Sequence, residues 1–380
     1  CWDGPAVPNT DKIVFWRFVM KKLFALALAG ALCLSLLAGC SGGSASSTTA
    51  GSTAANGELN LFAFGEMFPQ EVLDGFTQET GIKVNYSTFD TDETMLSRLE
   101  TSKGGDYDVV IADDYIIKTA IDEGLVSELD KDKIPNLGNV NPIYQGQFFD
   151  PEDKYTVPHG AGVMTIVYDP ALVGKEITSY EDLWDSSLAD NLAIIGNYRV
   201  IDGMALKLMG ESYNVEDPAV IQSAGEKLLE LAPNIRAIQD ANTQDLLISG
   251  EVAAAVMYTS QTYLAKINRS DLEIAYPTEG LGFGLMAQFV PVNAPNKDAA
   301  YQFINYLLDP EVGKQCFEYM GYYCTNQAAE ELFDEATKEL LVLPEGFLEE
   351  NDIEMIQPVS AEAEEAHMQV WTEFKSACGQ

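Results

Sequence analysis

The sequence is poor in the residues from which most enzyme active sites and transition-metal sites are built. Its 380 residues include two histidines, His159 and His367, so a Ser-His-Asp triad or a site with several histidine ligands has almost no material. No Gly-x-Ser-x-Gly, P-loop or His-Glu-x-x-His motif occurs. We therefore expect a protein that is not an enzyme and that uses no cofactor or metal.

Cysteine is also scarce where we expect the chain to fold. The six cysteines are Cys1, Cys33, Cys40, Cys316, Cys324 and Cys378. The first three belong to the N-terminal segment discussed below. The last three show no Cys-x-x-Cys spacing and no neighbouring pair of histidines, which speaks against a metal or redox centre. The sequence leaves the possibility of one disulfide among these three cysteines, but buried or free thiols are the favoured interpretation.

Positive charge is rare as well. The chain has 22 Lys and Arg residues against 59 Asp and Glu residues, for a net charge of −37. Without residues 1–39 the balance is 18 against 57, or −39. Such a charge argues against nucleic acid as a partner and is compatible with cationic solutes. An acidic surface that only maintains solubility explains the charge equally well.

The one long hydrophobic run lies in residues 20–40, MKKLFALALAGALCLSLLAGC. Lys21 and Lys22 form a basic n-region, residues 23–37 an apolar h-region, and small residues precede Cys40, which is typical of a lipoprotein signal peptide. The h-region is short for a permanent membrane helix, and no stop-transfer pattern follows. We expect Cys40 to become the lipidated N-terminus of the mature chain.

The segments around this signal are not expected to fold. Residues 1–19 precede it and begin without a methionine, so we interpret residues 1–39 as upstream sequence and signal peptide. Residues 40–57 are rich in Ser, Gly, Thr and Ala and suit a flexible tether. The folded part is expected to begin near Glu58 and is long enough for two domains of ordinary size.

The first part of the folded chain alternates strands and helices. Apolar patterns predict strands at 59–64, 82–87 and 107–112, with helices at 69–79 and 91–103 between them. In such a βαβαβ unit, ligands bind beyond the carboxyl ends of the strands, here the turns at 63–68 and 113–116. The second turn opens a helix to 123 with Asp113 and Asp114, and helix capping explains at least one of these carboxylates.

A second set of elements follows. We expect strands at 160–168, 191–195, 235–238, 253–258 and 285–292, and helices starting at 180–184 and spanning 202–209, 218–232, 243–249, 297–309 and 310–320. The chain crosses near Gly162 and returns near Phe289, so two lobes face a cleft. We assign 58–161 plus 290–345 to lobe 1, 162–289 to lobe 2, and 346–380 to a C-terminal helical segment.

Five segments together resemble a known family. They are FTQETGIKVNYSTFDTDETM (76–95), YDVVIADDY (107–115), TSYEDLW (178–184), SGEVAAAVMYTS (249–260) and YQFINYLLDPEVGKQ (301–315). From about 59 to 375 the chain resembles the extracellular solute-binding proteins of ABC importers, in their spermidine/putrescine-binding branch. The resemblance implies an α/β, two-lobed periplasmic-binding-protein-like fold of type II with a hinge and an interlobe ligand cleft. Such a receptor closes on its solute and delivers it to a permease.

The resemblance also implies a set of binding residues. The family stacks aromatic rings on the methylene chain of a polyamine and surrounds its amines with carboxylates. By position, Phe64 and Tyr258 stand where the family has tryptophan, and Tyr115 and Tyr322 stand where it has tyrosine. Gln357 matches a pocket glutamine. An aromatic wall is therefore expected in this chain too.

Several positions differ from the family. Asn197 and Val200 stand where two acidic residues clamp an amine, and Met286 stands where the family has a central aspartate. Gly284 and Met67 replace a tryptophan and a tyrosine. Because two buried ammonium groups need carboxylate partners, either other acids bind a rearranged amine or the solute carries less positive charge.

Some acid remains near the expected pocket. Glu66 matches a family glutamate, and Asp113 takes a position where the family has serine; Asp114 is adjacent. Arg199 could bind an anionic group, but a structural arginine tied to a carboxylate is the favoured interpretation. The predicted ligand-binding set is Phe64, Glu66, Asp113, Tyr115, Asn197, Tyr258, Tyr322 and Gln357.

Alternative functions stay open. The solute could be zwitterionic, or it could be ferric iron held by the adjacent Tyr322 and Tyr323 with His159 or Glu66. A sensory ligand-binding domain would use the same lobes. Under the leading interpretation, the partners are a small polyamine-like solute, an ABC permease with its ATPase, and the membrane through the lipid anchor. The receptor is expected to be a monomer on the outer face of the cell membrane.

Overall fold

The computed structural model describes residues 57–379 of the chain. The expected signal peptide, the lipidation site Cys40 and the Ser/Gly-rich tether lie outside the described residues. Within residues 57–379, no helix combines the length and the apolar character needed to cross a membrane.

Ten strands of the described chain join into one mixed sheet. They are β1 (Glu58–Phe64), β2 (Lys83–Phe89), β3 (Val109–Asp113), β4 (Thr156–Tyr168), β5 (Leu192–Ile194), β6 (Ile235–Ile238), β7 (Ala254–Tyr258), β8 (Glu273–Ala275), β9 (Leu281–Phe289) and β10 (Ile353–Met355). Their order is β2-β1-β3-β9-β4-β7-β5-β6, with β10 beside β9 and β8 beside β4. The sheet is parallel in β2-β1-β3 and in β7-β5-β6 and antiparallel between them. Two parallel halves are thus joined by antiparallel strands.

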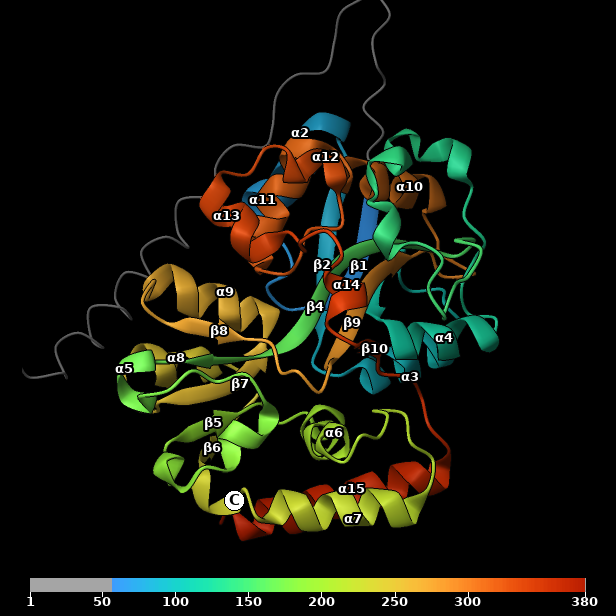
Figure 1. The fold of residues 1–380 in the computed structure, drawn as a ribbon. Coiled ribbons are helices and arrows are strands. Elements are labelled where there is room, and N and C mark those ends of the chain that lie inside the picture. Colours follow the sequence, from blue (N-terminus) through green and yellow to red (C-terminus); the bar gives the residue numbers. More distant parts are fainter. Residues whose placement is uncertain (1–56, 380) are drawn as a thin grey trace, which may run out of the picture. The chain divides into compact units, whose positions relative to one another are not determined.

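Helices cover both halves of the sheet (Figure 1). They are α2 (Gln70–Thr80), α3 (Asp92–Ser102), α4 (Asp114–Asp122), α5 (Pro170–Val173), α6 (Tyr198–Leu208), α7 (Pro218–Leu229), α8 (Thr243–Ile248), α9 (Thr259–Asn268), α10 (Lys297–Leu307), α11 (Pro310–Met320), α12 (Gln327–Glu330), α13 (Glu335–Leu341), α14 (Phe347–Glu350) and α15 (Ala361–Ala377). Helices α2, α10 and α11 pack on the half that contains β1, whereas α6, α7 and α15 pack on the half that contains β5.

The first half has apolar residues on both faces of its strands. In β1, Leu61 faces one cluster with Val72 and Phe76 of α2, and Phe62 faces another with Met95 of α3. All five side chains are almost fully buried. Because successive side chains of a strand point to opposite faces, a strand covered on both sides must be apolar throughout. This explains the unbroken run LNLFAF.

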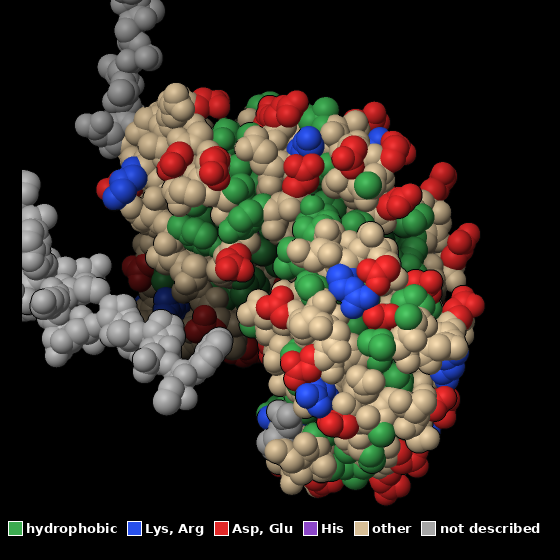
Figure 2. All heavy atoms as spheres, turned by 90° about the vertical axis from the view of Figure 1, so that its left-hand side faces the viewer, with side chains coloured by type: hydrophobic (Ala, Val, Ile, Leu, Met, Phe, Trp, Pro, Cys, Tyr) green, Lys and Arg blue, Asp and Glu red, His purple; other side chains and the backbone are tan. Residues whose placement is uncertain are grey.

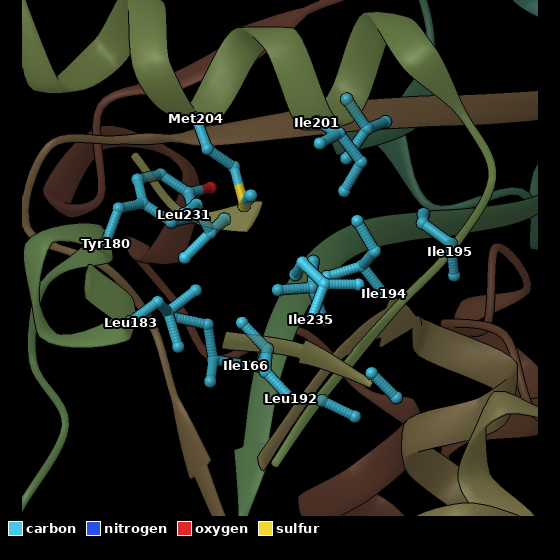
Figure 3. Close-up of a cluster of buried hydrophobic side chains, with 14 of the residues drawn as sticks. Ile166, Tyr180, Leu183, Leu192, Ile194, Ile195, Ile201, Met204, Leu231 and Ile235 are labelled. Atoms are coloured by element: carbon cyan, nitrogen blue, oxygen red, sulfur yellow. The ribbon is translucent and has the colours of Figure 1, made fainter. Parts of the chain in front are cut away.

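The second half has its own core beneath helix α6. Ile201 and Met204 of α6 point toward the strands, where Leu192 and Ile194 of β5 lie (Figure 3). The C-terminal helix α15 adds Phe374 to the same cluster. Full burial of one such side chain contributes roughly 1.5–3 kcal/mol. The last helix of the chain is therefore an integral part of the second core.

Strands β4 and β9 connect the two halves. Residues 156–163 of β4 pair with β9, and residues 164–168 pair with β7. Gly162 of β4 lies opposite Gly284 of β9. Glycine has no side chain that restricts its backbone dihedral angles. The backbones of both connecting strands therefore have the most conformational freedom at this pair. The glycine pair lies at the predicted crossing of the chain near Gly162.

Most predicted elements are confirmed, with differences where the local pattern is weak. Helix α6 begins at Tyr198, not at 202, because the Asn197 side chain caps it by accepting from the Val200 N–H (3.3 Å). Strand β4 begins at Thr156, before the predicted start at 160. A pairing irregularity near Pro158 interrupts the strand pattern from which this start could have been predicted. Residues 180–184 form a 3-10 turn that does not continue.

Two longer elements also differ from the prediction, and the short elements α5, α12, α13, α14, β8 and β10 were not predicted individually. Helix α9 was not predicted, since TSQTYLAKIN carries few apolar residues. Strand β9 spans Leu281–Phe289 where 285–292 was expected, because its first residues, LGFG, include two glycines. The three cysteines of the described chain are unbonded, with Cys316 and Cys324 buried, in agreement with the favoured interpretation.

Candidate ligand-binding site

The carboxyl ends of the parallel strands bring predicted residues to one edge of the first half. Phe64 is the last residue of β1 and Asp113 the last of β3. The Phe64 ring packs against Phe89 at the end of β2, with 4.4 Å between ring centroids. Helix α3 starts just beyond Phe89, at Asp92. This edge is where a parallel sheet commonly binds its ligand.

Asp92 and Asp113 form a hydrogen-bonded carboxyl pair at this edge. The Asp113 N–H donates to Asp92 Oδ1 (3.3 Å), and the Tyr115 hydroxyl donates to Asp92 Oδ2 (3.1 Å). Burial, with the charge of a neighbouring aspartate, raises the pKa of Asp113 to about 7 and the pKa of Asp92 well above its ordinary value. Because the two carboxyls interact, they titrate as a pair, and the negative charge of Asp113 develops only as the pH rises through about 7.

Asp114 has a structural role beside the pair. Its Oδ1 accepts from the Tyr115 N–H (2.7 Å) and its Oδ2 from the Leu285 N–H (2.9 Å), which ties α4 to β9. Burial raises the pKa of Asp114 to about 7. Asp113 precedes α4 as its cap residue, yet its side chain makes no capping hydrogen bond. Of the two carboxylates, Asp113 is the one available to a solute.

Two tyrosines lie near Asp113. Tyr258 is the last residue of β7 and Tyr322 follows α11. Burial raises the pKa of both phenols, that of Tyr322 to about 12, and the negative charge of Asp113 adds to the effect on each. The side chains therefore converge from both halves of the sheet. We call Asp92, Asp113, Tyr258 and Tyr322 the aspartate–tyrosine cluster.

Glycines in β4 set the position of the Tyr322 ring. A β-carbon added at Gly162 would lie 3.3 Å from Tyr322 Cδ1 and 3.1 Å from Thr259 Oγ1. A β-carbon at Gly160 would lie 3.5 Å from Tyr322 Cβ. The ring thus rests directly on the backbone of the connecting strand, which a side chain at 162 would prevent.

Asn197 lies beside Tyr258, whereas Val200 does not belong to the site. A side-chain hydrogen bond joins Asn197 to the Tyr258 phenol. Val200 is 1% exposed and points into the second core. Of the two family positions that hold acids, one therefore stays at the site as an amide and the other has become core.

Glu66 and Gln357 are not joined to the cluster. Glu66 is exposed in the turn after β1, with a positive φ of 59°. Gln357 is exposed in the loop before α15, where its N–H donates to Asn214 Oδ1 (2.7 Å). No hydrogen bond or ion pair between described residues links either side chain to the aspartate–tyrosine cluster.

Arg199 has the structural role expected of it. Its Nη2 donates to the backbone carbonyls of Tyr213 (3.1 Å) and Gln357 (3.3 Å), and its Nη1 lies 3.8 Å from Glu364 Oε2. Burial lowers the pKa of this guanidinium. The arginine holds the loop before α15 against α6 and offers little to an anionic group of a solute.

The geometry does not favour ferric iron. Tyr322 packs in the cluster of the first core that contains α11, whereas Tyr323 packs in the other cluster, with its hydroxyl bonded to Tyr276. His159 is 4% exposed, and burial lowers its pKa to about 4. Among residues 57–379, no group of three or more His, Cys, Asp or Glu side chains is arranged to hold a metal ion.

Sequence reasoning missed two acidic residues at the strand ends. Asp92 was interpreted as part of a helix start, although it lies only three residues beyond the end of β2. Asp240 follows β6 by two residues, and its Oδ1 lies 3.5 Å from the Tyr258 hydroxyl. Applying the strand-end argument to every parallel strand would have found both.

Two cavities lie elsewhere. One of about 480 Å³ lies on the first half and is lined by Gly75, Gln78, Glu79, Asn136, Asn305, Tyr306, Asp309 and Val312. A much smaller one lies beside His159 and Gln288. Neither is lined by a residue of the predicted ligand-binding set, although His159, the possible iron ligand, lines the smaller one. The surface in Figure 2 carries many Asp and Glu side chains and few Lys or Arg, as the net charge implies.

Comparison with known proteins supplies the family. The family model of the bacterial extracellular solute-binding proteins matches residues 71–340. The chain belongs to this family. The spermidine/putrescine-binding periplasmic protein of Salmonella typhimurium is 36% identical over 278 residues, 73% of this chain and 80% of the relative. The spermidine/putrescine-binding periplasmic protein 1 of Haemophilus influenzae is 32% identical, over 86% of this chain and 91% of the relative.

A solved structure supports the same assignment. The spermidine/putrescine ABC transporter substrate-binding protein PotD from Streptococcus pneumoniae matches with a TM-score of 0.75 and 30% identity, over 85% of this chain and 99% of that chain. The resemblance seen in the sequence is confirmed. The chain has the two-lobed periplasmic-binding-protein fold, binds a small-molecule solute outside the cytoplasm and interacts with a membrane permease. It is not an enzyme.

Proposed function

We propose that the chain is a lipid-anchored receptor that captures a polyamine-like cation and delivers it to an ABC permease with its ATPase. The names of the relatives, spermidine/putrescine-binding proteins, support a polyamine as the solute. The observation that carries the proposal is the aspartate–tyrosine cluster, in which the Asp113 carboxylate lies near Tyr258 at the end of β7 and near Tyr322 after α11.

The chemistry of the cluster suits an ammonium group. The charge of Asp113 is partly buried, and no Lys, Arg or His of the described chain forms an ion pair with Asp92, Asp113 or Asp114. A buried carboxylate without a cation is unfavourable, and an ammonium at this place offsets the cost. Tyr258 and Tyr322 can stack on the attached methylene groups and attract the cation through their ring faces.

A zwitterionic solute is the second candidate. Its carboxylate would need a positively charged partner, and the candidate is Arg199, which lies two residues after Asn197 in the sequence. Because the guanidinium of Arg199 is engaged by two backbone carbonyls and Glu364, this site supports a cation better than a zwitterion. A sensory receptor would bind its solute at the same cluster. The identity of the neighbouring genes would distinguish a sensor from a transport receptor.

The anchor and the division into lobes belong to the proposal. Lipidation of Cys40 rests on the signal-peptide pattern of residues 20–40, and mass spectrometry of the membrane fraction tests it, since an unmodified Cys40 would contradict it. We assign residues 58–161 with 290–345 to lobe 1 and residues 162–289 to lobe 2. The core contacts of α15 support placing that helix with lobe 2. The receptor is proposed to act as a monomer.

A thermal-shift screen of the purified full chain tests the solute class. The compounds are spermidine, putrescine, amino acids, betaines and ferric citrate. A ligand at about 100 times its Kd stabilises the folded chain by about 2.7 kcal/mol. We expect a clear rise in Tm with a polyamine. A rise with an amino acid or betaine, and none with any polyamine, would contradict the proposal.

A further inference from the structure

We propose that Asp240 supplies a second anionic contact of the site, so that the solute is a dication whose two ammonium groups are held by carboxylates of opposite lobes. The inference rests on the proposed function, because it assumes that the solute lies at the aspartate–tyrosine cluster. It adds a binding residue that the family's acidic positions do not provide, since those positions hold Asn197, Val200 and Met286 here.

Asp240 lies at the ligand-binding edge of the second half. It follows β6, next to the end of β5, where the Gly196 N–H donates to Asp240 Oδ1 (2.8 Å). A β-carbon added at Gly196 would lie 2.9 Å from Asp240 Oδ2. This approach is too close for any other residue without movement of the carboxylate. Glycine at 196 therefore lets the carboxylate sit against the turn that leads into α6.

Gln261 fixes Asp240 relative to Tyr258. The Gln261 Nε2 donates to the Asp240 carbonyl (2.6 Å), and its Oε1 accepts from the Tyr258 N–H (3.2 Å). One buried amide thus bridges the backbones of the two residues. With the phenol oxygen 3.5 Å from Asp240 Oδ1, the carboxylate is held at the rim of the tyrosine ring.

The charge of Asp240 has no cationic partner within the described residues. In the same half, Asp169 pairs with Arg269 at 2.8 Å and Asp190 with Arg236 at 3.1 Å. Asp240 accepts from a backbone N–H and a phenol, both neutral donors. Its side chain is exposed, so an arriving ammonium meets it without first displacing a lysine or arginine.

Tyr258 lies near both this carboxylate and the one in the first half. The negative charges of both Asp240 and Asp113 act on its phenol. A ring with one carboxylate at its hydroxyl and a second carboxylate nearby suits a short methylene chain with an ammonium at each end. A monoamine would satisfy only one of the two carboxylates, so the arrangement favours a diamine.

Calorimetry of the full chain with putrescine and n-butylamine tests the inference. The two ligands have the same carbon chain and differ by one ammonium group. The test variant is Asp240→Asn, which keeps an oxygen for the Gly196 N–H and removes the charge. The matched control is Glu226→Gln, which removes one exposed charge from α7 in the same half. Melting temperatures of all variants check that the fold is kept.

In the unmodified chain we expect putrescine to bind more tightly than n-butylamine. In Asp240→Asn the advantage of putrescine is expected to fall about tenfold or more, because the second ammonium loses its anionic partner, while n-butylamine changes little. Glu226→Gln is expected to keep the advantage. Gly196→Ala, whose β-carbon displaces the carboxylate, is a second variant that should reduce it too.

Two outcomes overturn the inference in distinguishable ways. If the unmodified chain binds putrescine and both Asp240→Asn and Gly196→Ala keep its full advantage over n-butylamine, Asp240 is an ordinary solvated surface acid and the proposed function stands. If the unmodified chain binds neither amine, the proposed function fails and this inference fails with it.

Discussion

The two halves of the sheet present different chemistry at their ligand-binding edges. The first half places three aspartates there, Asp92, Asp113 and Asp114, partly or fully buried and with raised pKa values. The second half places Tyr258 and an exposed Asp240 there. The aspartates at the first edge provide negative charge that a bound cation would neutralise. The second edge adds the ring surface of Tyr258 and the accessible carboxylate of Asp240. Under the proposed function, we expect the first lobe to pair with one ammonium group and the second lobe to contact the methylene chain and the other ammonium group.

A buried acid in the second half shows that burial alone does not mark a site. Asp202 is 1% exposed, and its Oδ2 lies 3.1 Å from His367 Nδ1, between α6 and α15. Burial raises the pKa of Asp202 well above its usual value and lowers that of His367 to about 4. Burial disfavours the charged form of both groups, so their contact is a structural hydrogen bond. Asp113 differs because it lies at a strand end, is only partly buried and has a pKa of about 7, so it ionises near neutral pH.

The largest expected effect concerns stability rather than binding. Phe374→Ala in α15 removes a fully buried ring from the second core and is expected to lower the free energy of unfolding by about 3–5 kcal/mol. Met368→Ala, in the same helix but 46% exposed, is the control and should cost less than about 1 kcal/mol. Denaturant unfolding measures both. Equal, small effects would show that α15 is an appendage and not part of the second core.

Replacing Asp113 should affect binding and stability in opposite directions. Asp113→Asn removes the charge that the solute pairs with, so we expect affinity for putrescine to fall by about 2 kcal/mol or more, near 30-fold. At pH 8 the same change removes an unpaired, partly buried charge, so the ligand-free chain should melt a few degrees higher. Glu100→Gln, an exposed acid on α3, is the control. Loss of affinity together with loss of stability would indicate a purely structural Asp113.

The pH dependence follows from the same carboxylate. Its pKa of about 7 in the folded chain exceeds the ordinary value near 3.8, so the folded state binds the extra proton between about pH 4 and 7. Unfolding free energy of the ligand-free chain should therefore fall as pH rises through this window. Putrescine affinity should change the other way, falling about tenfold from pH 8 to pH 6 as Asp113 is protonated. Calorimetry at both pH values measures it, and Asp113→Asn should show a flatter profile.

The smallest expected effect separates ring from hydroxyl in the second half. Tyr258→Ala should weaken putrescine binding by about 1 kcal/mol or more, because it removes the stacking surface. Tyr258→Phe keeps the ring and should bind nearly as the unmodified chain does. Unchanged affinity in Tyr258→Ala would mean that the site has been placed wrongly.

Much of the fold could be read from the sequence because periodicity reports burial. LNLFAF and VVIA predicted strands β1 and β3, since a strand covered on both faces is apolar throughout. Helix α9 escaped because its residues are mostly polar. The start of α6 was not predicted because it depends on a capping hydrogen bond, in which the Asn197 side chain accepts from the Val200 N–H. Such a cap has only a weak signal in the sequence.

The site was harder to predict than the fold. Family positions led to Tyr258, Tyr322 and Asp113, which the structure brings together. They also led to Glu66 and Gln357, which lie in exposed backbone segments and are not joined to the aspartate–tyrosine cluster. Asp92 and Asp240 were missed since each lies at a strand end far along the chain from its partner. Only the three-dimensional structure joins Asp92 to Asp113 across 21 residues and Asp240 to Tyr258 across 18.

The most direct test of the account is calorimetry of the full chain with putrescine and 4-aminobutanoate, which have four-carbon chains and differ in the charge of one end. A site built from carboxylates and tyrosines should bind putrescine at least about 100-fold more tightly, near 3 kcal/mol, because the zwitterion brings a carboxylate with no cationic partner. Tighter binding of 4-aminobutanoate would contradict the account and show that the site recognises a zwitterion.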